Sequence, residues 1–141
     1  MNVAVTWGDD KLGRLCLTYS RNGAGQGTKA AISQVAALLD QHQRRVNLLI
    51  DQQAADISAG EFISHISSLR LLAEHPKTQH VVIVGASAET QALCHSYPAF
   101  HHYHFAGTLE AGHRLLDELE YLSSLENLQI IGDFFPAASS S

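Results

Sequence analysis

Apolar and polar residues alternate with a period of two in the first part of the chain. Residues 3–7 (VAVTW) and 14–19 (RLCLTY) both show this pattern, and a turn-rich GDDKLG sequence lies between them. Two alternating segments joined by a turn are typical of a β-hairpin. Residues 46–51 and 80–85 are short apolar runs with the length of buried strands, and residues 101–106 form a fifth candidate.

Between these strands, apolar residues recur at intervals of three and four, which is the spacing of one face of an α-helix. The pattern predicts helices over residues 29–42, 59–74, 88–97 and 109–125. In the last helix it places five leucines on the inward face: Leu109, Leu115, Leu116, Leu119 and Leu122.

A residue with a hydroxyl side chain precedes each predicted helix, where it can accept a hydrogen bond from the first turn. These capping residues are Thr28, Ser58, Ser87 and Thr108. Ser58 also precedes Glu61 by three residues, which is the spacing of a capping box. The caps therefore support the predicted starts of the helices.

Strands that alternate with helices favour an α/β fold with a mostly parallel central sheet, and the first hairpin adds an antiparallel strand. The predicted order is ββαβαβαβα, with about five strands and four helices. The length of 141 residues suits one domain, which we place at residues 1–126. We expect residues 127–141 to form a tail that is apolar at first (LQIIGDFF) and disordered at its end.

Composition and charge exclude several classes of function. Apolar residues make up 45% of the chain, which is enough for a core. The formal net charge is −5 and the nine Lys and Arg residues are scattered, so we expect no nucleic-acid partner. No apolar run reaches the roughly 18 residues of a membrane span, and we see no secretory signal. We therefore expect a cytoplasmic protein in which Cys16 and Cys94 are reduced thiols.

Four of the nine histidines lie in HHYHFAGTLEAGH, residues 101–113. On a strand, His102 and His104 would share a face and could offer two imidazoles to one metal. A zinc site needs three or four ligands, so His113, Cys94, His95 or a carboxylate would have to converge on them. Histidines on an edge strand that faces solvent are the alternative. We expect no metal and no cofactor, and keep His102 and His104 as the alternative metal ligands.

Two loops lie where ligands bind in related folds. The glycine-rich NGAGQGTK, residues 22–29, joins a strand to a helix, but its G-x-G-x-G spacing fits neither the dinucleotide fingerprint nor the P-loop. We expect it to be a flexible connector. Asp51 ends a buried strand, at the edge where open α/β sheets bind ligands. Asp56 and Ser58 follow in the same loop, where turn and cap geometry is the alternative explanation.

The order of these segments resembles the STAS/SpoIIAA-like fold, the group that includes the anti-sigma-factor antagonists. Three features carry the resemblance. A strand that ends at Asp51 precedes a loop and a capped helix, an I-V-G strand follows, and Phe105 to Ala111 (Phe-x-x-x-x-Glu-Ala) leads into the last helix. The resemblance covers roughly residues 1–125.

In the antagonists, a partner kinase phosphorylates a serine in a D-S-S-G-type motif at the start of the second helix, which switches binding. The nearest match here is DISAG, residues 56–60, in which an isoleucine replaces one serine and Ala59 precedes the glycine. The resemblance implies Ser58 as the phosphorylated residue. An exposed N-cap serine also tolerates added negative charge, because the helix N-terminus favours it.

We therefore expect a non-enzymatic regulatory or binding domain that acts through a protein partner, with Ser58, Asp56 and Asp51 in the recognition surface. The apolar tail suggests a second surface, which packs on the same chain or forms a homodimer. Its residues are Ile130, Ile131, Phe134 and Phe135. The alternative function is a carrier of a small apolar, lipid-like ligand in a pocket between helices and sheet. A metal-dependent enzyme that uses the histidine cluster is a third class.

Overall fold

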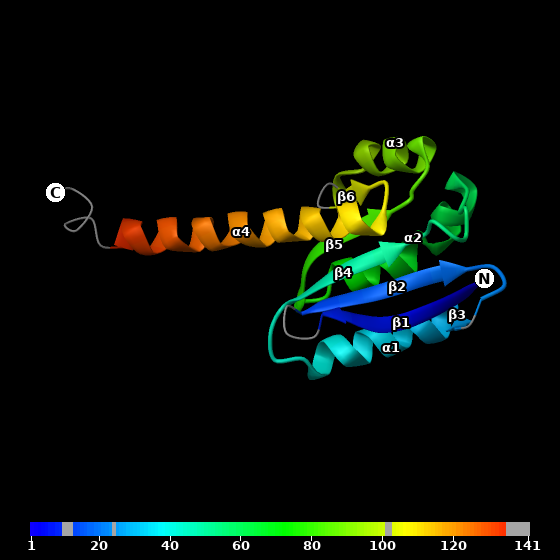
Figure 1. Ribbon diagram of the computed structural model, residues 1–141, viewed down its shortest axis with the longest axis horizontal. Coiled ribbons are helices and arrows are strands. Elements are labelled where there is room, and N and C mark those ends of the chain that lie inside the picture. Colours follow the sequence, from blue (N-terminus) through cyan, green and yellow to red (C-terminus); the bar gives the residue numbers. More distant parts are fainter. Residues whose placement is uncertain (10–12, 24, 101–102, 135–141) are drawn as a thin grey trace.

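Six strands form the mixed sheet at the centre of this computed structural model, which describes residues 1–9, 13–23, 25–100 and 103–134 (Figure 1). The strands are β1 (Asn2–Asp9), β2 (Arg14–Ser20), β3 (Gln26–Gly27), β4 (Val46–Asp51), β5 (Thr78–Val84) and β6 (Tyr103–Ala106). Their spatial order is β3-β1-β2-β4-β5-β6. β1 runs antiparallel to β2 and β3, and β2, β4, β5 and β6 run parallel to one another. The predicted α/β class, the mostly parallel sheet and the first hairpin are thus confirmed.

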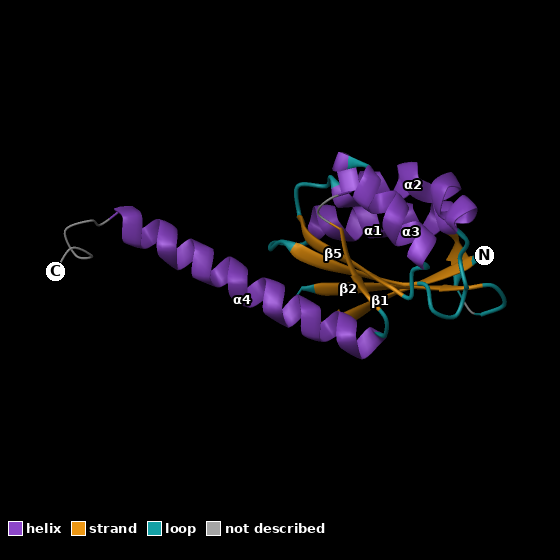
Figure 2. Cartoon of the chain, turned by 90° about the horizontal axis from the view of Figure 1, so that it is seen from above, coloured by secondary structure: helices purple, strands orange, loops and turns teal. Residues whose placement is uncertain are grey.

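Helices cover both faces of the sheet within the described ranges. They are α1 (Thr28–Gln41), α2 (Ala59–Ala73), α3 (Ala88–Ser96), the 3₁₀ helix η1 (Pro98–Phe100) and α4 (Leu109–Phe134). Figure 2 shows α1, α2 and α3 on one face and α4 alone on the other. The order of the elements follows the prediction, with β3 and η1 added to it.

The sheet separates two hydrophobic cores, because successive strand residues point to opposite faces. The larger core lies on the face of α1, α2 and α3, where Leu17 and Leu48 are fully buried. The smaller core lies under α4 and consists of Cys16, Leu49, Val82, Val84 and Leu116. Gly112 lets α4 approach this face closely, since an added Cβ would lie 3.0 Å from Val84 Cγ2 and 3.1 Å from Leu49 Cδ1.

Three of the four predicted helix caps form as expected. Ser58, Ser87 and Thr108 each accept a hydrogen bond of 3.1 Å from the backbone N–H three residues later. The prediction for Thr28 was wrong. Gly27 is the N-cap of α1 without a side-chain hydrogen bond, and Thr28 is the first helical residue.

The sequence GQG explains this difference at the start of α1. Gln26 and Gly27 pair with β1 as the short strand β3, so the chain passes directly from a strand into the helix. Gly25 has φ +142, and an added Cβ there would lie 2.8 Å from the carbonyl carbon of Val3. The predicted flexible connector therefore contains an edge strand that requires glycine beside it.

The last helix is longer than predicted, because α4 continues to Phe134. Leu116 is fully buried, but Leu109 and Leu122 are 39% and 53% exposed, so their predicted inward position was wrong. For Leu122, the reason is that α4 extends past the edge of the sheet and its C-terminal half projects away from the other elements (Figures 1 and 2), whereas Leu109 is the first residue of the helix. Ile130, Ile131 and Phe134 lie in this part of the helix, and Phe135 lies outside the described residues.

Candidate functional site

The carboxyl ends of the parallel strands form the edge at which the predicted site residues lie. Asp51 ends β4, and its Oδ1 accepts a hydrogen bond of 3.0 Å from the N–H of Gln53. The side chain of Gln53 in turn donates to the carbonyl oxygen of Gly107 (3.0 Å), which connects this loop to the start of α4. Asp51 therefore holds the turn that leads toward α2.

Ser58 is an exposed residue and is the N-cap of α2. Its Oγ accepts the N–H of Glu61 at 3.1 Å and lies 3.3 Å from Glu61 Oε1, while its own N–H donates to the same Oε1 at 3.4 Å. The predicted capping box is therefore present. The arrangement leaves the Ser58 hydroxyl in contact with a carboxylate oxygen at the surface.

Arg21 completes this cluster and was not found by sequence reasoning. Its Nε donates to the carbonyl oxygen of Ala55 (2.7 Å), and its Nη2 donates to the carbonyl oxygen of Asp56 (3.2 Å). Nη2 also forms an ion pair of 2.7 Å with Glu61 Oε1. The guanidinium thus connects the loop before α2 to the first turn of the helix.

A signal for Arg21 was present in the sequence. β2 runs parallel to β4, with Thr18 opposite Asp51, so a residue just beyond β2 reaches the loop just beyond β4. The parallel register was needed to use this signal, and the sequence pattern alone did not supply it.

One oxygen, Glu61 Oε1, receives bonds from both Arg21 and Ser58. The hydrogen bond from Arg21, followed by the bonds from Ser58, lowers the pKa of Glu61 below its usual value. The same hydrogen bond to Glu61 raises the pKa of Arg21. Both groups are therefore charged at neutral pH, and the Ser58 hydroxyl borders a carboxylate that is already paired.

Asp56 serves backbone geometry in this loop. Its φ is +48, in the left-handed region that aspartate tolerates better than most residues. Its N–H donates to the carbonyl oxygen of Gln52 at 3.3 Å, which closes the turn before Ile57, and Ile57 is buried in the core. The turn thereby sets the direction in which Ser58 enters α2.

The histidines are distributed over several environments. His104 lies on β6, and its ring is in edge contact with the ring of His80, with 6.0 Å between the ring centroids. The ring of His95 is in edge contact with the ring of Phe105, with 5.9 Å between the centroids. His102 falls outside the described residues. Within the ranges that the structure describes, no three His, Cys, Asp or Glu side chains are grouped as metal ligands. His102 and His104 thus remain a prediction without a described third ligand.

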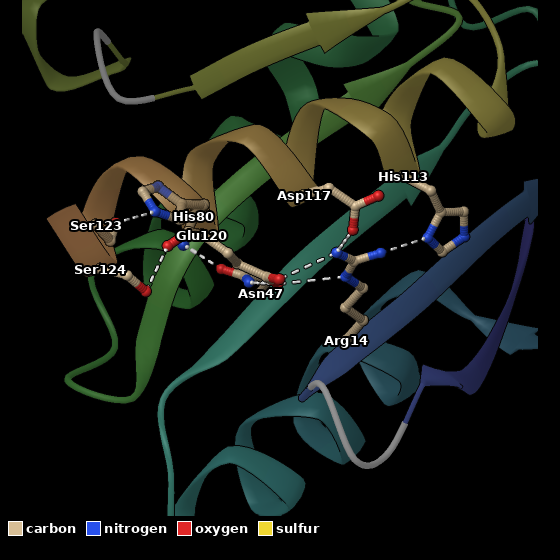
Figure 3. A network of polar contacts seen from close by, with 8 residues as sticks. All are labelled: Arg14, Asn47, His80, His113, Asp117, Glu120, Ser123 and Ser124. Carbon is tan, nitrogen blue, oxygen red and sulfur yellow. Dashed lines mark hydrogen bonds and ion pairs between the residues drawn. The ribbon is translucent and has the colours of Figure 1, made fainter.

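A second polar cluster lies between α4 and the sheet, and Figure 3 shows its residues. Arg14, 4% exposed, forms ion pairs with Asp117 and Glu120 on α4. Its Nη1 donates to His113 Nδ1 at 3.2 Å. Glu120 also accepts a bond of 2.6 Å from Asn47 Nδ2. Sequence reasoning missed this cluster because Arg14 and Asn47 lie 73 to 106 residues before their partners on α4 and meet them only across two layers.

A few further findings bear on the alternative functions. A pocket of about 280 Å³ lies on α4, lined by Ala111, Arg114, Leu115 and Glu118. It is not between the helices and the sheet, where the carrier alternative would place its ligand.

Cys16 and Cys94 are free and buried in different cores. None of the described helices is long and apolar enough to cross a membrane.

Comparison with known proteins gives no match, either to a family model, to a curated protein or to a solved structure. The class of protein that the fold defines is an α/β domain with a mixed, mostly parallel sheet. The STAS/SpoIIAA-like resemblance stays a prediction from the sequence.

Proposed function

We propose that this protein is a non-enzymatic regulatory domain that binds a protein partner through the start of α2, and that phosphorylation of Ser58 controls this binding. One observation carries the proposal. Ser58 is exposed, and its hydroxyl contacts the same Glu61 oxygen that Arg21 binds. A modification of this hydroxyl would therefore change both the charge and the shape of the surface at the start of α2.

Phosphorylation would change the contacts of Glu61. A phosphoserine carries about −1.5 to −2 charges at neutral pH and loses the hydroxyl proton. The Ser58 hydroxyl lies 3.3 Å from Glu61 Oε1, so the phosphate and this carboxylate would repel each other. The N-terminus of α2 favours the added negative charge, so the helix itself is expected to persist.

Arg21 would then bind the phosphate in preference to Glu61. Arginine binds phosphate with paired, charge-assisted hydrogen bonds, and Arg21 Nη2 already lies 2.7 Å from the oxygen that borders Ser58. Arg21 also holds the carbonyl groups of Ala55 and Asp56, so its movement would alter the loop before α2. Partner binding would therefore differ between the two states of Ser58.

The chain offers a matched control at Ser87. Ser87 is also exposed and also caps a helix, because its Oγ accepts a hydrogen bond of 3.1 Å from the N–H of Thr90. The full-length protein and the variants Ser58→Ala and Ser87→Ala would be isolated from their native cells and analysed by phosphopeptide mass spectrometry. We expect phosphate at Ser58 in the unmodified chain and in Ser87→Ala. Phosphate elsewhere only, or none under any growth condition, would overturn the switch.

The proposed binding of a partner is tested with a protein that co-purifies with this chain. Its affinity would be measured by calorimetry for the unmodified chain, Ser58→Asp and Ser87→Asp. We expect a change of about tenfold or more for Ser58→Asp, equivalent to about 1.4 kcal/mol, and little change for Ser87→Asp. Equal effects of the two variants would show that added charge acts without regard to position. A small apolar molecule bound to the purified chain in native mass spectrometry would favour the carrier alternative instead.

A further inference from the structure

One small core attaches α4 to its face of the sheet. Of the described helices, α4 alone lies on this face (Figure 2). Among the buried side chains described there, Leu116 is the one that α4 contributes, in the same cluster as Leu49, Val82 and Val84. The larger core lies on the other face, and its described residues all lie outside α4. Parts of a protein that few contacts hold can open separately, so α4 can leave the sheet while the larger core stays intact.

The link between β6 and α4 is short and open. It consists of Gly107 and Thr108. Gly107 is exposed, and nothing lies within 4 Å of the position that an added Cβ would take. Glycine has the widest choice of backbone angles, so the direction of α4 can change at this residue. The hydrogen bond of 3.0 Å that Gln53 Nε2 donates to the Gly107 carbonyl keeps the end of β6 in place.

A polar network joins α4 to the strands and has a histidine at each end (Figure 3). At one end, His113 Nδ1 on α4 lies 3.2 Å from Arg14 Nη1. Arg14 pairs with Glu120, and Glu120 accepts a hydrogen bond of 2.6 Å from Asn47 Nδ2. At the other end, Asn47 Oδ1 accepts the backbone N–H of His80 at 3.0 Å. Both histidines therefore lie where α4 contacts the sheet.

The contact with Arg14 requires a neutral His113. Arginine can only donate, so His113 Nδ1 accepts this hydrogen bond and carries no proton. A protonated imidazole has an N–H on both nitrogens, so a proton on His113 would remove the bond and place two cations 3.2 Å apart. Protonation of His113 would therefore weaken the attachment of α4.

The groups around His113 leave no free carboxylate of the network to compensate. The titratable and charged groups on this side of the network are Arg14 and Cys16 from β2, Asp51 from β4, and Asp117 and Glu120 from α4. Asp117 and Glu120 are already paired with Arg14. Glu110 and Arg114, also on α4, pair with each other at 3.7 Å.

His80 also favours the neutral form while α4 is in place. Its Nε2 lies 3.2 Å from Ser123 Oγ on α4. The titratable and charged groups around it are Glu120 and Glu126 from α4, Arg45 from the loop before β4, and His104 from β6. Burial has the largest influence and lowers the pKa of His80, whereas the two glutamates raise it and Arg45 lowers it. Since α4 contributes to this burial, His80 binds a proton more strongly once α4 has left.

We propose that α4 is a pH-controlled cover, which leaves the sheet as one unit when His80 and His113 bind protons and thereby exposes the apolar face of β4 and β5. Protons bind more strongly to the open form, so the open population rises as the pH falls below about 6.5. The exposed surface consists of Cys16, Leu49, Val82 and Val84. The proposal does not rest on Ser58, which caps α2 on the other face of the sheet.

Cys16 and Cys94 can report the opening, because they are free thiols in different cores. Cys16 lies in the core under α4, and Cys94 lies in the larger core. The full chain would be labelled at about pH 7.5 and about pH 5.5 with a pyridyl disulfide, which reacts with thiols at both values. Peptide mass spectrometry gives the rate at each cysteine. Dividing it by the rate at the same cysteine in the urea-unfolded chain removes the pH dependence of the reagent and of the thiol.

We expect the corrected rate at Cys16 to rise at least about threefold at the lower pH, because each proton bound on opening changes the equilibrium by up to about tenfold per pH unit. The corrected rate at Cys94 should stay the same, since the larger core remains closed. An unchanged rate at Cys16 would overturn the proposal. An equal rise at both cysteines would overturn it as well, because it would mean that the whole domain unfolds.

The combined variant His80→Gln and His113→Gln tests the two histidines, with His65→Gln as its control. Glutamine at position 113 can still accept the hydrogen bond from Arg14 but binds no proton. His65 lies on α2, on the other face of the sheet. The combined variant should lose most of the pH dependence at Cys16, and His65→Gln should keep it. Circular dichroism at about pH 7.5 verifies the fold of each variant. A pH dependence that persists in the combined variant would contradict the assignment to these histidines.

Discussion

At the scale of single residues, the contacts of Ser58 and Arg21 depend on different kinds of information. The capping box is written in four consecutive residues, so the sequence predicted it and the structure has it. The bonds of Arg21 to Ala55 and Asp56 join segments that are more than thirty residues apart, so local pattern did not reveal them. A local motif therefore predicted one half of the candidate site and the sheet register determined the other.

His80 gives a testable pH dependence at this scale. Burial lowers the pKa of His80 below its usual 6.5. The unfolded chain therefore binds more protons than the folded chain below about pH 6.5, and the free energy of unfolding should fall as the pH falls through this range. In His80→Gln, urea unfolding at about pH 7 and about pH 5 should differ less than in the unmodified chain. An unchanged difference would show that other groups cause the dependence.

At the scale of elements, two glycines in helices predict opposite effects of substitution. Gly60, in the first turn of α2, has only Ser58 Oγ near the position of an added Cβ, at 3.9 Å. Gly112, in α4, faces Val84 and Leu49 at 3.0 and 3.1 Å. Gly60→Ala should raise the free energy of unfolding by about 0.5–1 kcal/mol, because alanine favours the helix.

Gly112→Leu should lower the free energy of unfolding by about 1–3 kcal/mol, since α4 would have to move away from the sheet. Chemical denaturation of both variants measures these changes. A neutral result for Gly112→Leu would mean that α4 shifts without cost, contrary to the close approach described here.

The helices and strands also show how much of this fold can be predicted from the sequence. Five strands and four helices followed from periodicity and from caps, because each pattern is complete within its own segment. β3 has only two residues and exists through its pairing with β1, so no local pattern could predict it. The leucines of α4 were placed inward because a repeat of three and four shows that a helix has an apolar face, and does not show where its neighbour ends.

At the scale of the whole molecule, Arg14 connects α4 to the rest of the chain. Its side chain is 5% exposed and pairs with Asp117 and Glu120 across the layer boundary. Arg14→Met should lower the free energy of unfolding by about 2–3 kcal/mol, because Glu120, 27% exposed, would lose its charged partner. Urea unfolding followed by circular dichroism measures the change.

Arg70→Met is the matched control for this prediction. Arg70 pairs with Glu74 at 2.8 Å within α2, but both side chains are more than half exposed. Its loss should change the free energy of unfolding much less than Arg14→Met does, because water screens an exposed ion pair. A similar cost for the two variants would mean that burial of Arg14 adds nothing to its ion pairs.

The smaller core also has a consequence for the order in which the chain is synthesised. Leu49, Val82 and Val84 belong to strands made early, but Leu116, which covers them, belongs to the last helix. A nascent chain that ends after β6 can complete the larger core while this face of β4 and β5 stays exposed to solvent or to a chaperone. Exposed apolar surface promotes aggregation, so chains released before α4 is complete are expected to aggregate although most of their strands and helices have been made.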